Sequence, residues 1–409
     1  MVSETEMKNI LIIASIYGSK RVLGLARYLP EFGWSPTIIT PPVKWQPTII
    51  SSSLPEIEGV RVIETGYGGV KEPILKVGVA ISKSARPLVK KLLHFGGAII
   101  NYPDSYSGWR RFALRAGREV LNKGNVDAIM SICPITAHTV ASQLKREYPN
   151  VKWIGDLPDL WSQNHNYGYG EWRRKMDERL ELKTLASADV LTTSSEPRAE
   201  QLRELHKEKR VVAITLGYDE KEYDTGDVGL TNKFTITYTG LIYHGKQNPL
   251  LLIGALSNLM KGGSIDPSDC EVRFYGVEPI FESLRFPVKW YGRVPHADAV
   301  KAQKESQLLW LLDWDDPNEK GVNLGKAFEY LGARRPVIAT GGVKGNVTDK
   351  LIQETCSGWH AIDVQEMERI LEMCYREWKQ TGSVDYHGVG VERYTFREMA
   401  RKYVGLLDD

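Results

Sequence analysis

The plan of the fold is visible in IASIYGSKRVLGLARYL (residues 13–29) and TYTGLIYHGKQNPLLL (residues 237–252). Each stretch joins the end of an apolar strand to a glycine-bearing loop, and the loop to an amphipathic helix. This order is typical of the opening strand, loop and helix of a Rossmann-like domain. Because it occurs near the beginning of the chain and again past its middle, the sequence predicts two such domains in series.

Short runs rich in Ile, Val, Leu and Thr recur around both stretches, separated by segments of helical periodicity. This alternation predicts an α/β protein with parallel strands and crossover helices. The strands expected in the first half are residues 9–15, 36–40, 60–64, 127–131, 151–156, 189–193 and 211–216. Those expected in the second half are residues 234–239, 271–275, 288–291, 308–313 and 336–340.

Length and composition exclude several classes of protein. The chain has 409 residues, 42% of them hydrophobic and 25% charged, which is enough to bury the cores of two domains. A net charge of +2 gives no whole-protein argument for a nucleic-acid partner. The opening residues lack the apolar core of a signal peptide, no apolar run reaches membrane-spanning length, and the four widely spaced cysteines suit neither a zinc site nor a disulfide framework. We therefore expect a cytoplasmic protein with reduced cysteines.

The boundary between the domains is expected in a polar, glycine-rich segment without apolar periodicity, residues 217–229. Residues 1–216 would form the first domain and residues 230–388 the second. Residues 389–409 include an amphipathic helix, which we expect to return to the first domain.

The stretch GVNLGKAFEYLGARRPVIAT, residues 321–340, carries the strongest chemical pattern. A loop containing Asn323 leads into a helix that begins near Lys326 and stops before Pro336. Free backbone N–H groups and the positive end of the helix dipole at such a point suit a diphosphate. Glu329, one turn further, could accept hydrogen bonds from a sugar diol. A capped helix with solvated Lys and Glu side chains explains the spacing equally well.

Two further loops follow strands of the second domain. After residues 234–239, Gly240 would let a ligand approach the backbone, and Lys246 could place an ammonium group on phosphate oxygens. After residues 288–291, backbone groups of GRV, residues 292–294, could bind the edge of a nucleobase. Ordinary turns would explain both loops as well.

These three stretches, in this order, resemble the donor half of GT-B glycosyltransferases, in particular glycosyltransferase family 4. The resemblance covers nearly the whole chain, and KAFEYLGARRPVIA, residues 326–339, is its most specific part. It implies two Rossmann-like domains facing a cleft, a nucleotide diphosphate sugar as donor, and no cofactor. The donor site expected from these stretches and the resemblance comprises Gly18, Gly240, Tyr243, Lys246, Gly292, Arg293, Val294, Asn323, Leu324, Gly325, Lys326 and Glu329.

The sequence departs from the family pattern at two positions. Glu329 matches the second glutamate of the family's E-x7-E pair, but Gly321 occupies the position of the first, eight residues earlier, with only Glu319 nearby to substitute. Leu241 stands where many members carry a phosphate-binding arginine. The resemblance therefore leaves the sugar and the stereochemical outcome open, with retention as the family default.

In the first domain, DLPDLW, residues 156–161, follows a predicted strand and resembles the family's D-x-R-D-x-W passage. A carboxylate at this place could act as general base on an acceptor hydroxyl, so Asp156 is the first candidate and Asp159 the second. Either aspartate could instead cap the following turn. His138 and Trp161 are further candidates for contact with the acceptor, although a histidine within a capped helix is an equally ordinary feature.

The acceptor side is expected to be basic. Between residues 71 and 123 there are eleven basic residues against three acidic ones, and Arg110 and Arg111 begin an amphipathic helix there. Such a surface could contact anionic lipid, which fits a lipid-linked glycan acceptor. It could instead contact the phosphates of duplex DNA, which fits a DNA base as the acceptor to be modified, or be simply solvated. Asp313, Asp315 and Asp316 form the nearest approach to a metal motif, but we expect no metal requirement.

The function expected from the sequence is transfer of a sugar from a nucleotide diphosphate sugar to a hydroxyl of a glycan, lipid-linked or other acceptor. Two alternatives remain. A GT-B nucleotide-sugar epimerase would share the fold but need no acceptor. A sugar- or nucleotide-binding protein without turnover would fit the missing glutamate near Gly321.

Overall fold

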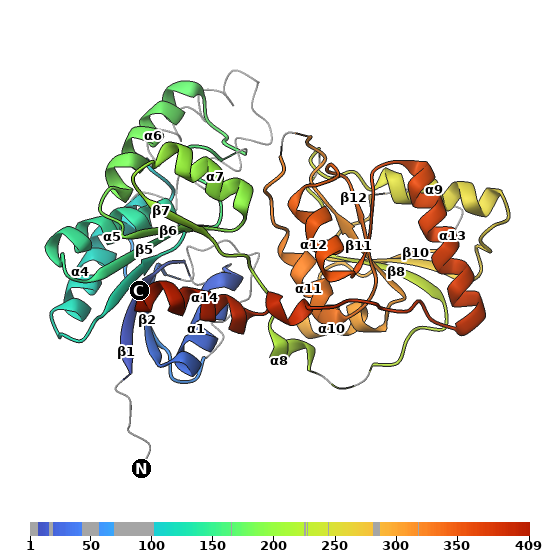
Figure 1. Cartoon of the computed structure of the whole chain (residues 1–409), viewed down its shortest axis with the longest axis horizontal. Helices are drawn as coiled ribbons and strands as arrows, with labels where there is room; N and C mark the ends of the chain where they lie inside the picture. Colours follow the sequence, from blue (N-terminus) through green and yellow to red (C-terminus); the bar gives the residue numbers. More distant parts are fainter. Residues whose placement is uncertain are drawn as a thin grey trace, which may run out of the picture. The chain divides into compact units, whose positions relative to one another are not determined.

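A computed structural model describes residues 7–15, 19–42, 57–68, 102–164, 166–224, 226, 228–243, 245–280, 287–317 and 319–409. The chain divides into two compact units. Unit 1 comprises Met1–Ile214 and Ala400–Asp409, and unit 2 comprises Thr215–Met399. Both are built as parallel sheets with crossover helices, which confirms the predicted α/β class (Figure 1).

Unit 1 contains a seven-stranded sheet in the order β3-β2-β1-β4-β5-β6-β7, with every described pairing parallel. Its strands are β1 (Lys8–Ile13), β2 (Trp34–Thr40), β3 (Arg61–Glu64), β4 (Ala128–Ser131), β5 (Lys152–Leu157), β6 (Val190–Thr193) and β7 (Arg210–Ala213). Its helices are α1 (Lys20–Tyr28), α4 (Arg110–Leu121), α5 (Ile135–Glu147), α6 (Glu171–Leu185) and α7 (Glu196–Leu205), together with most of α14 (Phe396–Asp408).

Unit 2 contains a six-stranded sheet in the order β10-β9-β8-β11-β12-β13, again parallel. Its strands are β8 (Phe234–Thr239), β9 (Cys270–Tyr275), β10 (Val288–Trp290), β11 (Leu308–Leu312), β12 (Val337–Thr340) and β13 (Gly358–Ala361). Its helices are α8 (Glu220–Tyr223), α9 (Leu250–Lys261), α10 (His296–Glu305), α11 (Gly325–Ala333), α12 (Val347–Thr355) and α13 (Val364–Thr381).

Successive residues of the central strands are buried on opposite faces of each sheet, which explains the continuous apolar runs in the sequence. In β11, Leu308 and Trp310 join a core with α9 and α13, whereas Leu309 and Leu311 join a second core with α11 and α12. Figure 1 shows these helices on the two sides of the sheet of unit 2. The helices thus cover both faces of the sheet, so a ligand can reach it only at the loops that follow the ends of the strands.

All twelve predicted strands are present, with ends that shift by a few residues; β13 is an additional strand. The segment predicted as a linker, residues 217–229, includes α8, and its Tyr218 and Tyr223 are buried in the core of unit 2. Two aromatic side chains therefore anchor what looked like a polar connection. Residues Ala400–Asp409 of α14 belong to unit 1.

Candidate functional site

The switch in strand order of unit 2 lies between β8 and β11. From β8 the sheet continues through β9 to β10 at one edge, and from β11 it continues through β12 to β13 at the other edge. In open parallel sheets, ligands bind at such a point, beyond the carboxyl ends of the strands. The loops after β8 and β11, together with helix α11 that follows the second loop, contain most of the predicted donor residues. The backbone N–H of Asp315 donates to the carbonyl of Lys246 at 2.7 Å, which joins these two loops directly.

Two glycines allow the backbone to pass closely at this point. Gly240 has φ +106°, and a Cβ there would lie 3.2 Å from the Nζ of Lys326. Gly276, at the end of β9, has φ +84°, and its Cβ would lie 3.3 Å from the backbone of Gly240. Side chains at these positions would be strained and would fill the space beside the lysine.

Lys326 lies in the first turn of α11 and points to the end of β8. Its ammonium group is 4.1 Å from the centroid of the Tyr238 ring, contacts the Tyr238 hydroxyl, and donates to the carbonyl of Leu241 at 3.3 Å. Burial raises the pKa of Tyr238, so this phenol stays neutral. The site therefore holds the positive charge of Lys326 beside Gly240, where no side chain covers the backbone.

The N-terminus of α11 has no side-chain cap. Leu324 occupies the N-cap position, and Asn323 and Gly325 flank it, so the predicted loop does lead into a helix here. The dipole of α11 adds to the charge of Lys326 at the same place, an arrangement able to bind a diphosphate.

Glu329 is half-buried one turn along α11. The Nε2 of Gln303 donates to Glu329 at 3.3 Å and to the hydroxyl of Thr239 at 2.9 Å, while its Oε1 accepts from Tyr223 at 2.8 Å. Gln303, a fully buried side chain on α10, lies in no motif and was not predicted as a site residue. It positions the carboxylate of Glu329 relative to the end of β8.

A pocket of about 660 Å³ opens beside Leu241 and Gly276, beyond the ends of β8, β9 and β10. The carbonyl of Gly292 accepts from the N–H of Gly276 at 2.5 Å, which fixes the predicted turn of residues 292–294 against the β9 loop. Arg293 reaches the pocket, and Val294 is half-buried. The pocket is lined by Leu241, Ile242, Gly276, Val277, Glu278, Pro279, Ile280 and Arg293.

Tyr243 and Lys246 lie in the loop after β8 and contact Trp314. The Tyr243 ring stacks on Trp314 with centroids 5.5 Å apart, and the Nζ of Lys246 is 5.9 Å from the Trp314 ring. The structure thus brings the predicted residues of this loop together with Trp314, which follows β11 and was not predicted.

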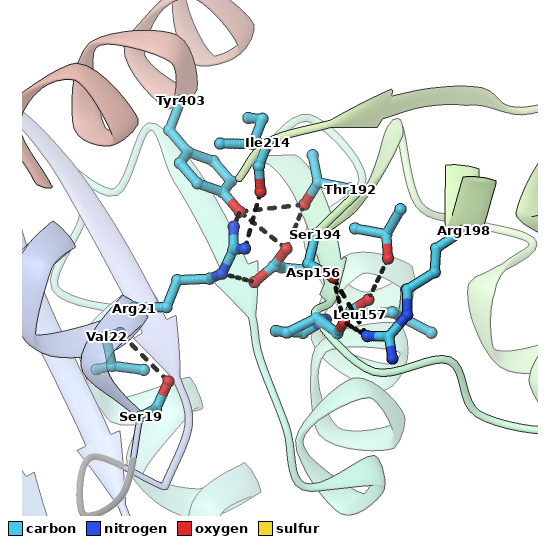
Figure 2. Close-up of polar contacts among 12 residues, drawn as sticks. Ser19, Arg21, Val22, Asp156, Leu157, Thr192, Ser194, Arg198, Ile214 and Tyr403 are labelled. Carbon is cyan, nitrogen blue, oxygen red and sulfur yellow. Dashed lines mark hydrogen bonds and ion pairs between the residues drawn. The ribbon is translucent and has the colours of Figure 1, made fainter. Parts of the chain in front are cut away.

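In unit 1, Asp156 lies at the end of β5 and is fully buried (Figure 2). Its Oδ1 accepts from Thr192 at 2.7 Å and from Tyr403 of α14 at 2.8 Å, and its Oδ2 is 3.5 Å from the Nε of Arg21. Arg21 also donates to Tyr403 at 2.6 Å and to the carbonyl of Ile214 at 2.8 Å. Burial raises the pKa of Asp156, while Arg21 and the two hydroxyls oppose that shift.

This environment differs from the one expected for a base. An acceptor hydroxyl could reach Asp156 only after Arg21 and Tyr403 had moved. Asp159, three residues later, is the more accessible carboxylate, with 75% of its side chain exposed and its Oδ1 2.8 Å from Arg198. The assignment of a base stays a prediction, and exposure favours Asp159 over Asp156.

The predicted acceptor residues do not form one cluster. His138 is buried, its Nδ1 lies 2.8 Å from the Ser131 hydroxyl, and burial lowers its pKa to about 4. Trp161 is packed in the core of unit 1. Both placements differ from the expected contact with an acceptor, because Trp161 packs in the apolar core and His138 is buried with its ring nitrogen against Ser131. Arg110 donates to Gln143 at 2.5 Å, and the exposed Arg111 lies over Phe112.

Gly18 and most of the basic stretch, residues 69–101, lie outside the described residues. Within the described ranges, no group of three or more His, Cys, Asp or Glu side chains is arranged to hold a metal ion. Asp313 is buried and accepts from the Trp314 N–H at 2.8 Å and from Asn346 at 2.9 Å. None of the helices in the described part of the chain is both long enough and apolar enough to cross a bilayer.

No protein-family profile matches the chain, and no curated protein sequence does. Solved structures do share its fold. The sucrose-phosphate synthase of Thermosynechococcus elongatus is 14% identical with a TM-score of 0.60, and each chain is covered to 98%. Alr3699/HepE of Anabaena, solved in complex with UDP-glucose, is 14% identical with a TM-score of 0.58, covering 98% of this chain and 99% of that one.

A UDP-forming α,α-trehalose-phosphate synthase from Burkholderia xenovorans, in complex with glucose-6-phosphate, is 12% identical with a TM-score of 0.60. It covers 98% of this chain and 100% of its own. A UDP-N-acetylglucosamine 2-epimerase described as putative, from Listeria monocytogenes, is 11% identical with a TM-score of 0.52, covering 98% and 96%. The predicted GT-B fold of two Rossmann-like domains is therefore confirmed.

Proposed function

We propose that the protein is a glycosyltransferase that moves a sugar from a nucleotide diphosphate sugar to an acceptor hydroxyl. The main support is the group at the switch point of unit 2, where Lys326 and the uncapped N-terminus of α11 adjoin the glycine turn after β8. One positive charge and one helix dipole directed at the same space suit a diphosphate. The adjoining pocket is large enough for a nucleoside.

In the proposed reaction, the bond from the anomeric carbon to the diphosphate oxygen breaks, and the nucleoside diphosphate leaves with the electron pair. The acceptor oxygen bonds to the anomeric carbon, and its proton passes to a base. We assign Lys326 and Lys246 to the leaving diphosphate and Glu329 to the sugar hydroxyls. Asp159 is the candidate base, and Asp156 supports it by fixing the end of β5. A glycan or lipid-linked glycan is the proposed acceptor. The transfer is proposed to need no metal and to retain the anomeric configuration, so the acceptor oxygen must bond on the face of the anomeric carbon from which the diphosphate leaves.

Binding of nucleoside diphosphates tests the donor site. A panel of UDP, GDP, TDP, CDP and ADP should contain one that raises the free energy of unfolding, by about 2.7 kcal/mol at a hundred times its dissociation constant. Lys326→Met should weaken that binding roughly 10- to 100-fold, because a charge-assisted contact is lost. The exposed Lys350 on α12 offers a matched control, since Lys350→Met removes the same charge elsewhere in unit 2.

The products distinguish transfer from the alternatives. A transferase releases nucleoside diphosphate in proportion to added acceptor. An epimerase would convert the nucleotide sugar without acceptor, and a binding protein would release nothing. If no nucleoside diphosphate binds, or if Lys326→Met and Lys350→Met bind equally well, the proposed donor site is wrong.

A further inference from the structure

Helix α6 of unit 1 buries several charged side chains and exposes several apolar ones, unlike an ordinary surface helix. Its buried side chains include Arg173, Asp177 and Glu181, each at most 1% exposed. Trp172 and Met176, by contrast, are each 42% exposed. Surface helices normally bury an apolar stripe and expose charges. Figure 1 shows α6 on the outside of the sheet of unit 1.

Polar contacts hold the inward face in place, so this arrangement does not reflect a loosely attached helix. Arg173 donates to the carbonyl of Pro103 at 2.8 Å, lies 3.1 Å from Asp177, and covers the ring of Tyr102 at 4.3 Å. Glu181 accepts from the Ser162 N–H at 2.9 Å. These bonds fix which side of α6 faces outward.

The outward stripe interleaves apolar and cationic side chains. Its positions are spaced i, i+3, i+4, i+7, i+10 and i+11, which places them on one face over about 17 Å of helix. All six are exposed and none is acidic; they are Trp172, Lys175, Met176, Arg179, Leu182 and Lys183. The half-exposed Tyr169 extends the aromatic end of the stripe just before α6. The exposed acids Glu171 and Glu178 lie to one side of it, and Glu171 pairs with Arg174.

We infer that this stripe, Trp172 to Lys183, docks unit 1 on an anionic lipid bilayer. Trp and Tyr prefer the boundary between lipid headgroups and acyl chains, and Lys and Arg are attracted to anionic headgroups. A protein partner fits less well, because lysine is depleted from the centre of protein interfaces, and here two lysines lie within the stripe. The inference concerns attachment only, so it holds whether or not the donor site acts as proposed.

Vesicle co-sedimentation tests this inference with the full chain. Phosphatidylcholine vesicles containing phosphatidylglycerol should bind the protein, pure phosphatidylcholine vesicles should bind it much less, and salt should weaken binding. The variant K175Q/R179Q/K183Q should bind about a hundredfold less, at roughly fivefold per cation. Its matched control, K261Q/K301Q/K350Q, makes the same charge change at exposed positions of unit 2 and should bind as wild type.

The apolar part is tested separately by Trp172→Ala, which should reduce vesicle binding and abolish the blue shift of tryptophan fluorescence that vesicles induce in the wild type. Circular dichroism and thermal unfolding establish that each variant is folded. The inference is wrong if folded wild-type protein ignores anionic vesicles, or if the two triple variants bind alike. Self-association that requires the stripe, without vesicle binding, would instead identify a protein interface and equally overturn the inference.

Discussion

Asp156 and Asp159 are three residues apart, yet the structure predicts different outcomes when each is replaced. Asp156→Ala leaves the buried guanidinium of Arg21 without its carboxylate, so urea unfolding should show a loss of roughly 3–5 kcal/mol. Asp159→Asn changes an exposed group and keeps an oxygen that can still accept from the buried Arg198, so it should lower the free energy of unfolding by about 1 kcal/mol or less. If Asp159 is the base, this second variant should nevertheless lose about 10²- to 10⁴-fold in turnover.

Two other results would change these assignments. Full stability of Asp156→Ala would show that the Arg21 pair contributes little. Full turnover of Asp159→Asn would remove Asp159 as the base and leave binding of the donor unaffected.

His138 gives a prediction about pH. Its pKa is about 4 in the folded protein, because burial disfavours the charged ring, whereas an unfolded histidine titrates near 6.5. Below pH 6.5 the unfolded chain therefore binds a proton that the folded chain does not, and stability falls as the pH drops towards 4. His138→Gln should remove up to about 3 kcal/mol of this dependence. Parallel urea titrations at pH 7.0 and 4.5 would measure it, and equal pH slopes for both proteins would contradict it.

Residues in local motifs were predictable, and residues joined over long distances were not. Gly240 lies in a loop after a strand, and Lys326 and Glu329 lie in the helix of a recognisable motif. The structure brings all three together at the carboxyl ends of the strands of one sheet. Arg21 and Tyr403 are 382 positions apart and meet only through the fold, so neither carries a signal in its own surroundings. The burial of Asp156 follows from that meeting and could not be expected from DLPDLW alone.

At the scale of elements, the continuous apolar strands were predictable because burial on both faces leaves a clear run of residues. Strand β13 was missed since Gly358–Ala361 reads GWHA, with no such run, and becomes a strand by pairing with β12. Helix α8 was missed because it is four residues long and strongly polar, with Tyr223 as its buried anchor.

Helix α14 should be necessary for the stability of unit 1. A chain that ends at Met399 loses Ala400, Tyr403, Leu406 and Leu407, which are all buried. It should unfold at clearly lower urea concentration than the full chain and should expose apolar surface that binds a hydrophobic dye.

The control for this truncation ends at Leu407. It removes Asp408 and Asp409, whose pairs with Lys8 and Arg210 are solvent-exposed and together contribute only about 1 kcal/mol or less. Equal losses in the two truncated chains would mean that the buried side chains of α14 are not the cause.

At the scale of the whole molecule, the proposed transfer should proceed without a divalent metal. Backbone dipoles and lysines at the donor loops supply the positive charge that an ion would otherwise provide. Transfer should therefore keep its rate after exhaustive treatment with EDTA. A loss of activity that magnesium or manganese restores would show that an ion shares the diphosphate with Lys326.

The passage of the chain through unit 2 before it completes unit 1 has a consequence for synthesis. Domains usually fold in the order in which the ribosome delivers them. Here the first domain to emerge cannot be completed until residues 400–409 have been made, because Tyr403 bonds to Arg21 and Asp156 from a segment synthesised after unit 2. Nascent unit 1 should therefore keep the Arg21–Asp156 pair open to solvent until Tyr403 has been synthesised, and should complete its folding only after unit 2 has emerged.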